Sequence, residues 1–213
     1  MQIIGRLSSI NVQKVIWCLG EMGKVEGRDF ERIDAGLDFG VNNTTDYLKM
    51  NPTGLVPTLI DGDFVLWESN AIVRYLAAGM GPGGLMPADL KVRADSDRWM
   101  DWTLGSLWPP LRTAFIGMTR TPEDKRNMAA IKTAFDDATK QIKALDEVLL
   151  KQSYCAGEAF TMGDIPTGLT VFRWMNLARR FPGQLGAVPV YDGVLAWHQR
   201  FSSRPVFKTI PAQ

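Results

Sequence analysis

The residues from Asn51 to Ala71 (NPTGLVPTLIDGDFVLWESNA) combine a turn, two short strands and the start of a helix. Residues 51–54 are typical of a turn, because proline pre-sets φ and glycine allows a positive φ. The β-rich runs 58–60 and 64–67 flank Asp61-Gly62, and this pattern predicts a hairpin. The helical run that follows opens at Glu68-Ser69, and its free N–H groups could bind an anion.

Val56 and Pro57 stand immediately before the first of these strands. A trans proline here would be an ordinary start of a strand. A cis proline would turn the backbone of Val56 outward and leave its N–H and C=O unpaired, and cis bonds are rare enough to be functional features. An unpaired backbone group beside a strand can take up a short extended peptide by strand addition.

This combination, Val56-Pro57 followed by Glu68-Ser69, resembles the glutathione-binding half of the glutathione S-transferase family, in particular its bacterial theta- or Nu-like members. The resemblance implies an α/β N-terminal thioredoxin-like domain joined to an all-α C-terminal domain. It also implies an enzyme that activates the glutathione thiolate for attack on an apolar electrophile. Glutathione would be a cosubstrate, and no permanently bound cofactor is implied.

Composition limits the other possibilities. The chain has 213 residues, is 46% hydrophobic and carries a net charge of +1, which argues against nucleic acid or an anionic membrane as a partner. Its first residues are too short and too poor in charge for a secretory signal, and no apolar run approaches the roughly 20 residues of a membrane span. Two separated cysteines and one histidine make a metal site unlikely and suit the reducing cytoplasm.

The order of the predicted elements in the first half is strand, helix, strand, helix, strand, strand, helix, which is the thioredoxin-like arrangement. Val12 to Met22 has helical spacing of apolar residues, and Gly23 is expected just after its end. The other expected segments are strands at 3–4 and 30–34, a helical turn at 46–50, the hairpin at 58–67, and a helix from about Glu68 through 72–76.

The glycine- and proline-rich stretch Gly79 to Pro87 predicts a linker between domains at 1–79 and 88–213. Beyond it the pattern is helical. The expected features are a helix from Asp89 to about Ile116 interrupted near Pro109-Pro110, a long helix capped by Thr121 and continuing to Leu149, a capping box from Thr161 to Asp164, and a last helix from Tyr191 to about Phe201.

Glutathione carries its own thiol, so the protein needs only to hold that thiol as the thiolate. A hydroxyl that donates to the thiolate is worth roughly 1.5–3 kcal/mol, which lowers the thiol pKa by about one to two units. The resemblance implies Ser9 as the first candidate donor, Asn11 as the second and Ser8 as the third. The competing interpretation is that these residues simply cap the helix. Tyrosine and cysteine are both absent before Val12, which argues against the classes that use them.

The resemblance implies a role for each residue of the binding half. Glu68 would accept from the γ-glutamyl ammonium, Ser69 would hold the γ-glutamyl carboxylate, and Val56 beside Pro57 would bind the cysteinyl backbone. The competing interpretation is that Glu68 and Ser69 only cap a helix. Leu55 departs from the family pattern of Lys or Gln at the glycyl end, for which the remaining candidates are Lys49 and Asn51.

In the second half, the resemblance places Asp97 where it would reach the glutathione of the partner subunit in a homodimer. The cosubstrate pocket would be walled by Trp102, Leu107, Trp108 and Phe115, although aromatic residues at such spacing also form ordinary cores. His198 is expected to be structural. The alternatives are a glutathione-dependent isomerase or lyase on the same fold and a non-enzymatic interaction module.

Overall fold

The computed structural model describes residues 1–79 and 83–211 and divides the chain into two compact units. The first unit comprises residues 1–88 and 204–211, and the second comprises residues 89–203. The linker predicted at 79–87 therefore ends within the first unit, and its residues Met80, Gly81 and Pro82 lie outside the described residues.

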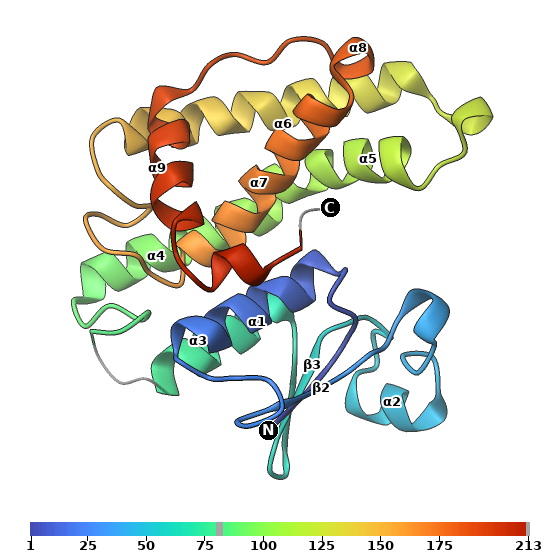
Figure 1. Ribbon diagram of the computed structural model, residues 1–213, viewed down its shortest axis with the longest axis vertical. Coiled ribbons are helices and arrows are strands. Elements are labelled where there is room, and N and C mark those ends of the chain that lie inside the picture. Colours follow the sequence, from blue (N-terminus) through green and yellow to red (C-terminus); the bar gives the residue numbers. More distant parts are fainter. Residues whose placement is uncertain (80–82, 212–213) are drawn as a thin grey trace. The chain divides into compact units, whose positions relative to one another are not determined.

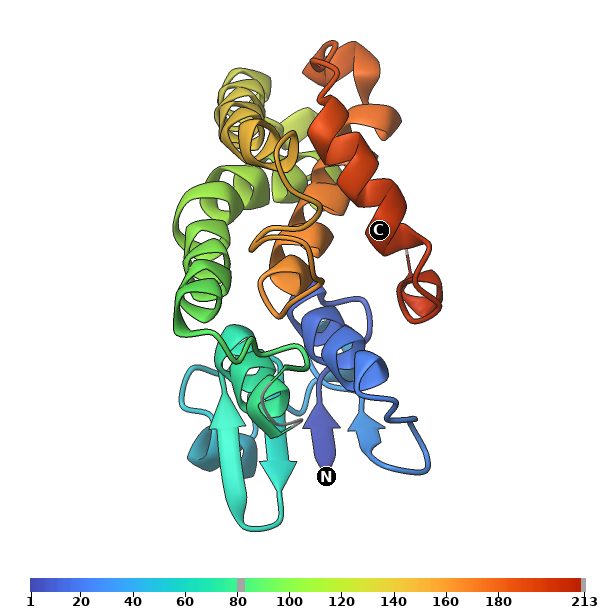
Figure 2. The ribbon, with the colours of Figure 1, turned by 90° about the vertical axis from the view of Figure 1, so that its left-hand side faces the viewer.

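The first unit is built on a four-stranded sheet in the order β2-β1-β3-β4 (Figure 2). Its strands are β1 (Gln2–Ile4), β2 (Glu31–Ile33), β3 (Thr58–Asp61) and β4 (Phe64–Trp67). β1 runs parallel to β2 and antiparallel to β3, and β3 and β4 form the predicted hairpin. The parallel pair needs a crossover connection, which the first helix supplies.

The helices of this unit are α1 (Ile10–Glu21), α2 (Thr45–Met50) and α3 (Ser69–Gly79), with a short 3₁₀ turn η1 (Leu37–Phe39). α1 and α3 lie side by side in Figure 1, and α2 lies apart from them. Ile4 packs with Tyr47 of α2, so the alternation of a strand directs the fully buried Ile3 to the opposite face. The predicted element order is confirmed, and Gly23 follows α1 with a φ of 73°.

Residues 204–211, which the sequence assigned to the second domain, pack on the first unit. Arg204 forms an ion pair with Glu21 at the end of α1, with Nη2 2.5 Å from Oε2. The ring of Phe207, in the 3₁₀ turn η4 (Phe207–Thr209), lies 4.9 Å from that of Trp17. These contacts join residues about 190 apart in the chain, and no local pattern indicates them.

The second unit is helical. α6 packs against both α5 and α9 (Figure 1). In the described part of the chain no helix is both long and apolar enough to cross a membrane. Its elements are α4 (Leu90–Trp102), a π-helical turn η2 (Thr103–Leu107), α5 (Trp108–Thr119), a 3₁₀ turn η3 (Glu123–Lys125), α6 (Met128–Leu149), α7 (Asp164–Arg180), α8 (Pro182–Leu185) and α9 (Asp192–Ser202).

The break in the helical stretch after Asp89 lies earlier than the sequence predicts. The π-helical turn at 103–107 separates α4 from α5, and Pro109 and Pro110 then occupy the first turn of α5. Residues on both sides of the π-helical turn keep right-handed helical dihedrals, so the helical path continues from α4 into α5. The irregularity therefore lies in the turn just before the prolines and not at the prolines themselves.

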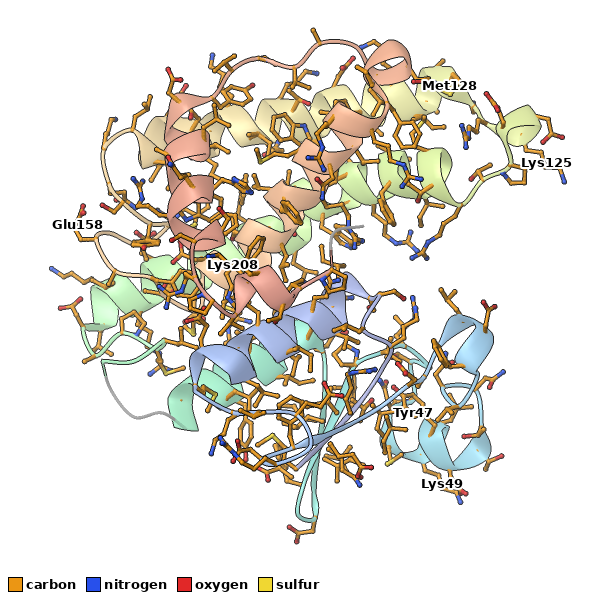
Figure 3. The ribbon with its side chains drawn as sticks, in the orientation of Figure 1. Tyr47, Lys49, Lys125, Met128, Glu158 and Lys208 are labelled. Atoms are coloured by element: carbon orange, nitrogen blue, oxygen red, sulfur yellow. The ribbon has the colours of Figure 1, made fainter. Side chains whose placement is uncertain are left out.

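The predicted helix start at Thr121 is wrong. The Thr121 hydroxyl donates to the carbonyl of Ile116 at 3.3 Å and caps nothing, and residues 123–125 form only a 3₁₀ turn. The helix begins at Met128, where the Asn127 side chain accepts from the Ala130 N–H at 3.1 Å. Figure 3 shows Lys125 on the separate turn and Met128 at the start of α6.

The capping motif before α7 is present and centres on the fully buried Asp164. Its carboxylate accepts from the backbone N–H groups of Thr161 and Cys155, at 2.8 and 2.9 Å, and from the indole N–H of Trp197 at 2.9 Å. Burial raises the pKa of Asp164, and the donors oppose that rise. One detail differs from the prediction: the Thr161 hydroxyl accepts from the N–H of Gly163, at 3.3 Å, and not from that of Asp164.

Replacing Asp164 with alanine should destabilise the protein strongly, since it leaves three buried donors without an acceptor. At about 1–3 kcal/mol for each such group, we expect a loss of at least about 3 kcal/mol in the free energy of unfolding. Urea unfolding followed by circular dichroism measures this loss. Asp137→Ala, which removes a half-exposed carboxylate from α6, is the control and should change stability by less than about 1 kcal/mol. Equal effects of the two substitutions would contradict this account of Asp164.

Candidate active site

Three segments of the first unit meet at one end of its sheet. β1 and β3 pair Ile4 with Thr58, and β3 and β4 pair Thr58 with Trp67. Gly5, Pro57 and Glu68 are the next residues beyond these pairs, so the register brings them to the same edge. A Cβ at Gly5 would lie 3.1 Å from Cβ of Val56, which shows how closely the loop after β1 approaches the loop before β3.

Val56 presents unpaired backbone groups at this end of the sheet. The Val56–Pro57 peptide bond is cis, which is the second of the two alternatives considered from the sequence. Among the described residues, neither the N–H nor the C=O of Val56 forms a hydrogen bond, and β3 pairing begins only at Thr58. The Val56 side chain is half-buried and packs against the cluster around Ile4 and Tyr47. One donor and one acceptor are thus presented beside a strand, where an extended peptide could pair with them.

Buried polar groups hold the loop that precedes Val56 through hydrogen bonds. The carbonyl of Leu55 accepts from Tyr47 Oη at 2.5 Å and from Asn51 Nδ2 at 2.8 Å. Asn51 Nδ2 also donates to Thr58 Oγ1 at 3.1 Å, so this side chain is committed to the loop. Lys49 points away from the loop and pairs with Asp46 at 2.9 Å (Figure 3). Neither candidate for the glycyl end is directed to the edge, and the Leu55 side chain is 66% exposed.

Glu68 and Ser69 form the start of α3. Glu68 has a φ of 72°, a left-handed conformation that residues with a Cβ seldom adopt. Its carbonyl accepts from the N–H of Ile72 at 2.9 Å, so Glu68 occupies the N-cap position while its side chain is exposed. Ser69 is buried, and the first N–H groups of the helix lack helical partners. This helix start presents a carboxylate, a hydroxyl and positive partial charge at one place.

Ser9 is the N-cap residue of α1 but does not act as a side-chain cap. Its backbone is extended, with φ −86° and ψ 124°, and its carbonyl accepts from the N–H of Gln13. The Ser9 hydroxyl makes no hydrogen bond to α1 or to any other described residue, although the residue is only 9% exposed. Asn11, half-buried in the first turn, likewise has no hydrogen bond from its side chain within the described chain, whereas Ser8 lies exposed in the preceding turn. The helix-cap interpretation therefore does not account for the Ser9 hydroxyl.

The protein's own thiols are unsuited to chemistry. Cys18 and Cys155 are both free and fully buried, and burial raises the pKa of each thiol. Cys18 Sγ lies 3.8 Å from the carbonyl of Val73, inside the α1–α3 contact. A reactive thiolate at the edge of the first unit would have to come from a bound molecule.

Two of the predicted pocket residues in the second unit surround a buried cation that the sequence did not indicate. The guanidinium of Arg173 lies 4.2 Å from the ring centroid of Phe115 and 5.8 Å from that of Trp108. Arg173 is only 5% exposed, and burial, aided by the nearby Arg120, lowers its pKa to about 9. Aromatic rings beside a buried guanidinium form an environment that suits an apolar or aromatic group of a ligand.

The remaining predicted residues of this unit lie elsewhere. Leu107 is fully buried in the core, and Trp102 packs edge-on against Trp99 at 5.0 Å. Asp97 is half-buried on α4. A separate apolar cavity of about 340 Å³ lies among α7, α8 and α9, and none of the predicted pocket residues lines it.

Comparisons with known proteins identify the family of this chain. Residues 6–78 match the family model of the glutathione S-transferase N-terminal domain, and residues 100–205 match that of the C-terminal domain. Glutathione S-transferase GstB of Escherichia coli K12 is 35% identical over 208 residues, which cover 97% of this chain and 95% of the relative. Glutathione S-transferase 3 of Zea mays is 29% identical over 217 residues, covering 100% of this chain and 94% of that protein.

Solved structures extend the match to the fold. The theta class glutathione S-transferase of Xanthomonas axonopodis pv. citri, in a crystal structure with glutathione bound, superposes with a TM-score of 0.88 at 40% identity, covering 98% of this chain and 95% of that one. Glutathione transferase F7 of Populus trichocarpa, at 23% identity and a TM-score of 0.82, shares the fold over 98% of this chain and 96% of its own. With both domain models matched and relatives aligned from end to end, this chain belongs to the glutathione S-transferase family.

Proposed function

We propose that this protein is a glutathione transferase, which binds glutathione at the sheet edge of its first unit and promotes attack of the thiolate on an apolar electrophile. One observation carries the proposal. The backbone N–H and C=O of Val56, which form no hydrogen bond among the described residues, lie at the same end of the sheet as the start of α3 at Glu68-Ser69. The Ser9 hydroxyl, which caps nothing, lies on the loop that follows the adjoining strand β1.

In this proposal the tripeptide lies extended across the end of the sheet and pairs with the loop before β3. The cysteinyl backbone pairs with Val56 beside Pro57, while Glu68 accepts from the γ-glutamyl ammonium and Ser69 receives the γ-glutamyl carboxylate at the helix start. Ser9 donates to the sulfur, with Asn11 as the alternative donor. The free thiol has a pKa of about 8.5, so a shift of one to two units lowers it to roughly 6.5–7.5 and makes the thiolate a large fraction of the bound glutathione near neutral pH.

The electrophile would be held by the second unit. Trp108 and Phe115 supply aromatic surface beside the Arg173 guanidinium and are the wall residues that we propose. Leu107 is fully buried in the core and Trp102 packs against Trp99, so neither is included in this wall. An electrophile with an apolar body suits such walls. The free, buried cysteines suit a reducing compartment, and we propose the cytoplasm as the location.

Replacing Ser9 with alanine should lower turnover at least about tenfold while glutathione affinity stays close to normal, because the lost donor acts on the thiolate and not on the tripeptide backbone. Turnover with a chlorodinitrobenzene and glutathione binding by calorimetry measure the two quantities. The pH profile of turnover should move to higher pH, because the thiol pKa is no longer lowered. If Ser9→Ala keeps its turnover and Asn11→Ala loses it, Asn11 is the donor and the Ser9 assignment is wrong.

Replacing Glu68 with glycine should separate binding from stability. Glycine adopts a positive φ without the cost, roughly 1 kcal/mol, that a Cβ brings, so the variant should be at least as stable as the parent. Loss of the carboxylate should weaken glutathione binding about tenfold or more. Glu68→Ala is the matched control, since it removes the same carboxylate but keeps the Cβ. A Glu68→Gly protein less stable than Glu68→Ala would refute this assignment of strain.

We further propose a homodimer in which Asp97 reaches the glutathione of the partner subunit. An aromatic patch on the first unit is formed by Phe64 and Tyr75, whose exposed fractions are 45% and 40%. The rings of Phe64 and Tyr75 are 5.3 Å apart, and Tyr75 is held by its hydrogen bond to Asp61. A rigid exposed aromatic patch of this kind is typical of an interaction surface.

Phe64→Glu should dissociate the proposed dimer, because it introduces a carboxylate into the aromatic patch. Sedimentation should give twice the 23.7 kDa chain mass for the parent and the single chain mass for the variant. Val25→Glu changes an equally exposed residue away from the patch and serves as the control. A Phe64→Glu protein that sediments like the parent would remove the patch from the interface.

A further inference from the structure

Neither end of α1 follows the usual rules for a stable helix. Ser9 stands at the N-cap, but its side chain makes no cap hydrogen bond, and the first turn carries no acidic residue. At the other end, Glu21 places a carboxylate in the last turn, where the partial charge of a helix is already negative. An uncapped first turn frays easily. The position of Ser9, the proposed thiolate donor, therefore depends on contacts from outside the helix.

Residues 204–211, which we call the strap, lie along α1 and compensate for the carboxylate in its last turn. Arg204 Nε donates to Glu21 Oε1 at 2.8 Å, and Nη2 donates to Oε2 at 2.5 Å. The indole of Trp17 donates to the same carboxylate at 2.9 Å, and the side chain of Glu21 is only 8% exposed. Because a buried carboxylate is tolerated when it is paired and hydrogen-bonded, this ion pair anchors the strap at the end of α1.

The strap then packs closely on the surface of α1. A Cβ added at Gly20 would lie 2.3 Å from a methyl carbon of Val206, so the strap leaves no room for a side chain there. The rings of Phe207 and Trp17 are 4.9 Å apart, and both residues are buried. As the strap runs forward, its contacts run backward along the helix. The two segments are thus antiparallel, and the strap proceeds toward the start of α1.

Gln13 connects the strap to the first turn of α1. Its Nε2 donates to the carbonyl of Pro211 at 3.3 Å, and the residue is only 3% exposed. Its backbone N–H donates to the carbonyl of Ser9 at 2.9 Å. Gln13 is four residues from both Ser9 and Trp17, so the three lie on one face of the helix, which the strap follows. A single residue therefore links the strap to the one whose hydroxyl the proposed function uses.

We infer that Gln13 is a positioning residue for the thiolate site, and that the strap, acting through Gln13, holds the start of α1 in place of a side-chain cap at Ser9. The Ser9 hydroxyl can then serve a ligand without loosening the helix that carries it. This inference rests on the proposed function and adds residues 204–211 to the part of the chain that the site needs. Local rules broken in one helix and compensated from elsewhere in the chain are typical of functional sites.

Gln13→Met keeps the approximate length of the side chain and removes its donor. Bound glutathione should then ionise at higher pH, because the Ser9 hydroxyl is held less firmly toward the sulfur. Turnover of a chlorodinitrobenzene at neutral pH should fall about threefold to tenfold and approach the parent value at high pH, while glutathione affinity changes by less than about twofold. The measurements are turnover across pH, the ultraviolet absorbance of the thiolate in the complex with glutathione, and calorimetry.

Gln2→Met is the matched control. Gln2 lies at the far end of β1 from the site, and its Nε2 donates to Glu31 at 3.3 Å, so the same substitution there should leave the pH profile unchanged. Phe207→Ala tests the strap itself and should move the profile in the same direction as Gln13→Met. The double variant should move it no further than the larger single shift, because both substitutions act through one connection.

An unchanged pH profile in Gln13→Met overturns the inference. So does a loss of turnover that is equal at every pH and accompanies a lower urea midpoint, since a purely structural residue gives that result. A shift in Gln13→Met without one in Phe207→Ala overturns the role of the strap. If either variant fails to fold, Gln13→Leu or Phe207→Leu replaces it. A parent that does not lower the pKa of the bound thiol overturns the proposed function itself.

Discussion

The register of β3 is the constraint on which the candidate site depends. Thr58 pairs with Ile4 on one side and with Trp67 on the other, so a single residue ties three strands together at the end of the sheet. A shift of one residue in either pairing would turn Leu59 and Ile60 to the opposite faces and separate Val56 from Glu68. Leu59 is fully buried, whereas Ile60 packs toward Tyr47 and Val56, so burial on both faces enforces this register.

Around that edge, the polar groups divide into those that support the loops and those that remain available. Tyr47 and Asn51 donate hydrogen bonds to the Leu55 carbonyl, and Thr58 Oγ1 belongs to the same hydrogen-bond network. The Ser9 hydroxyl and the backbone of Val56, by contrast, have no hydrogen-bond partner among the described residues. Buried polar groups are normally satisfied within the protein, so groups left over beside a satisfied network are those that a ligand can use.

Sequence patterns predicted the structural features that depend on residues close together in the chain. The hairpin, the helix that ends before Gly23 and the Thr161–Asp164 motif each depend on residues within a few positions of one another, and all three are present. The predicted start of α6 was wrong, although Thr121-Pro122 is a typical local signal for a helix start. The Thr121 hydroxyl donates to the Ile116 carbonyl and so does not cap a helix. The return of residues 204–211 to the first unit, and the approach of Arg173 to Phe115, depend on contacts between distant segments, for which the chain carries no short-range pattern.

Lys14 shows the same limit at the site itself. In the sequence it is a polar residue between Val12 and Val15, and the default for lysine on a helix is exposure with the stem along the surface. Its burial follows only when α3 packs beside α1 and places Ser69 against it, 55 residues away. The Glu68-Ser69 motif could be read from the chain because its residues are adjacent. The burial of Lys14 could not be predicted, because α1 and α3 meet only in the folded unit.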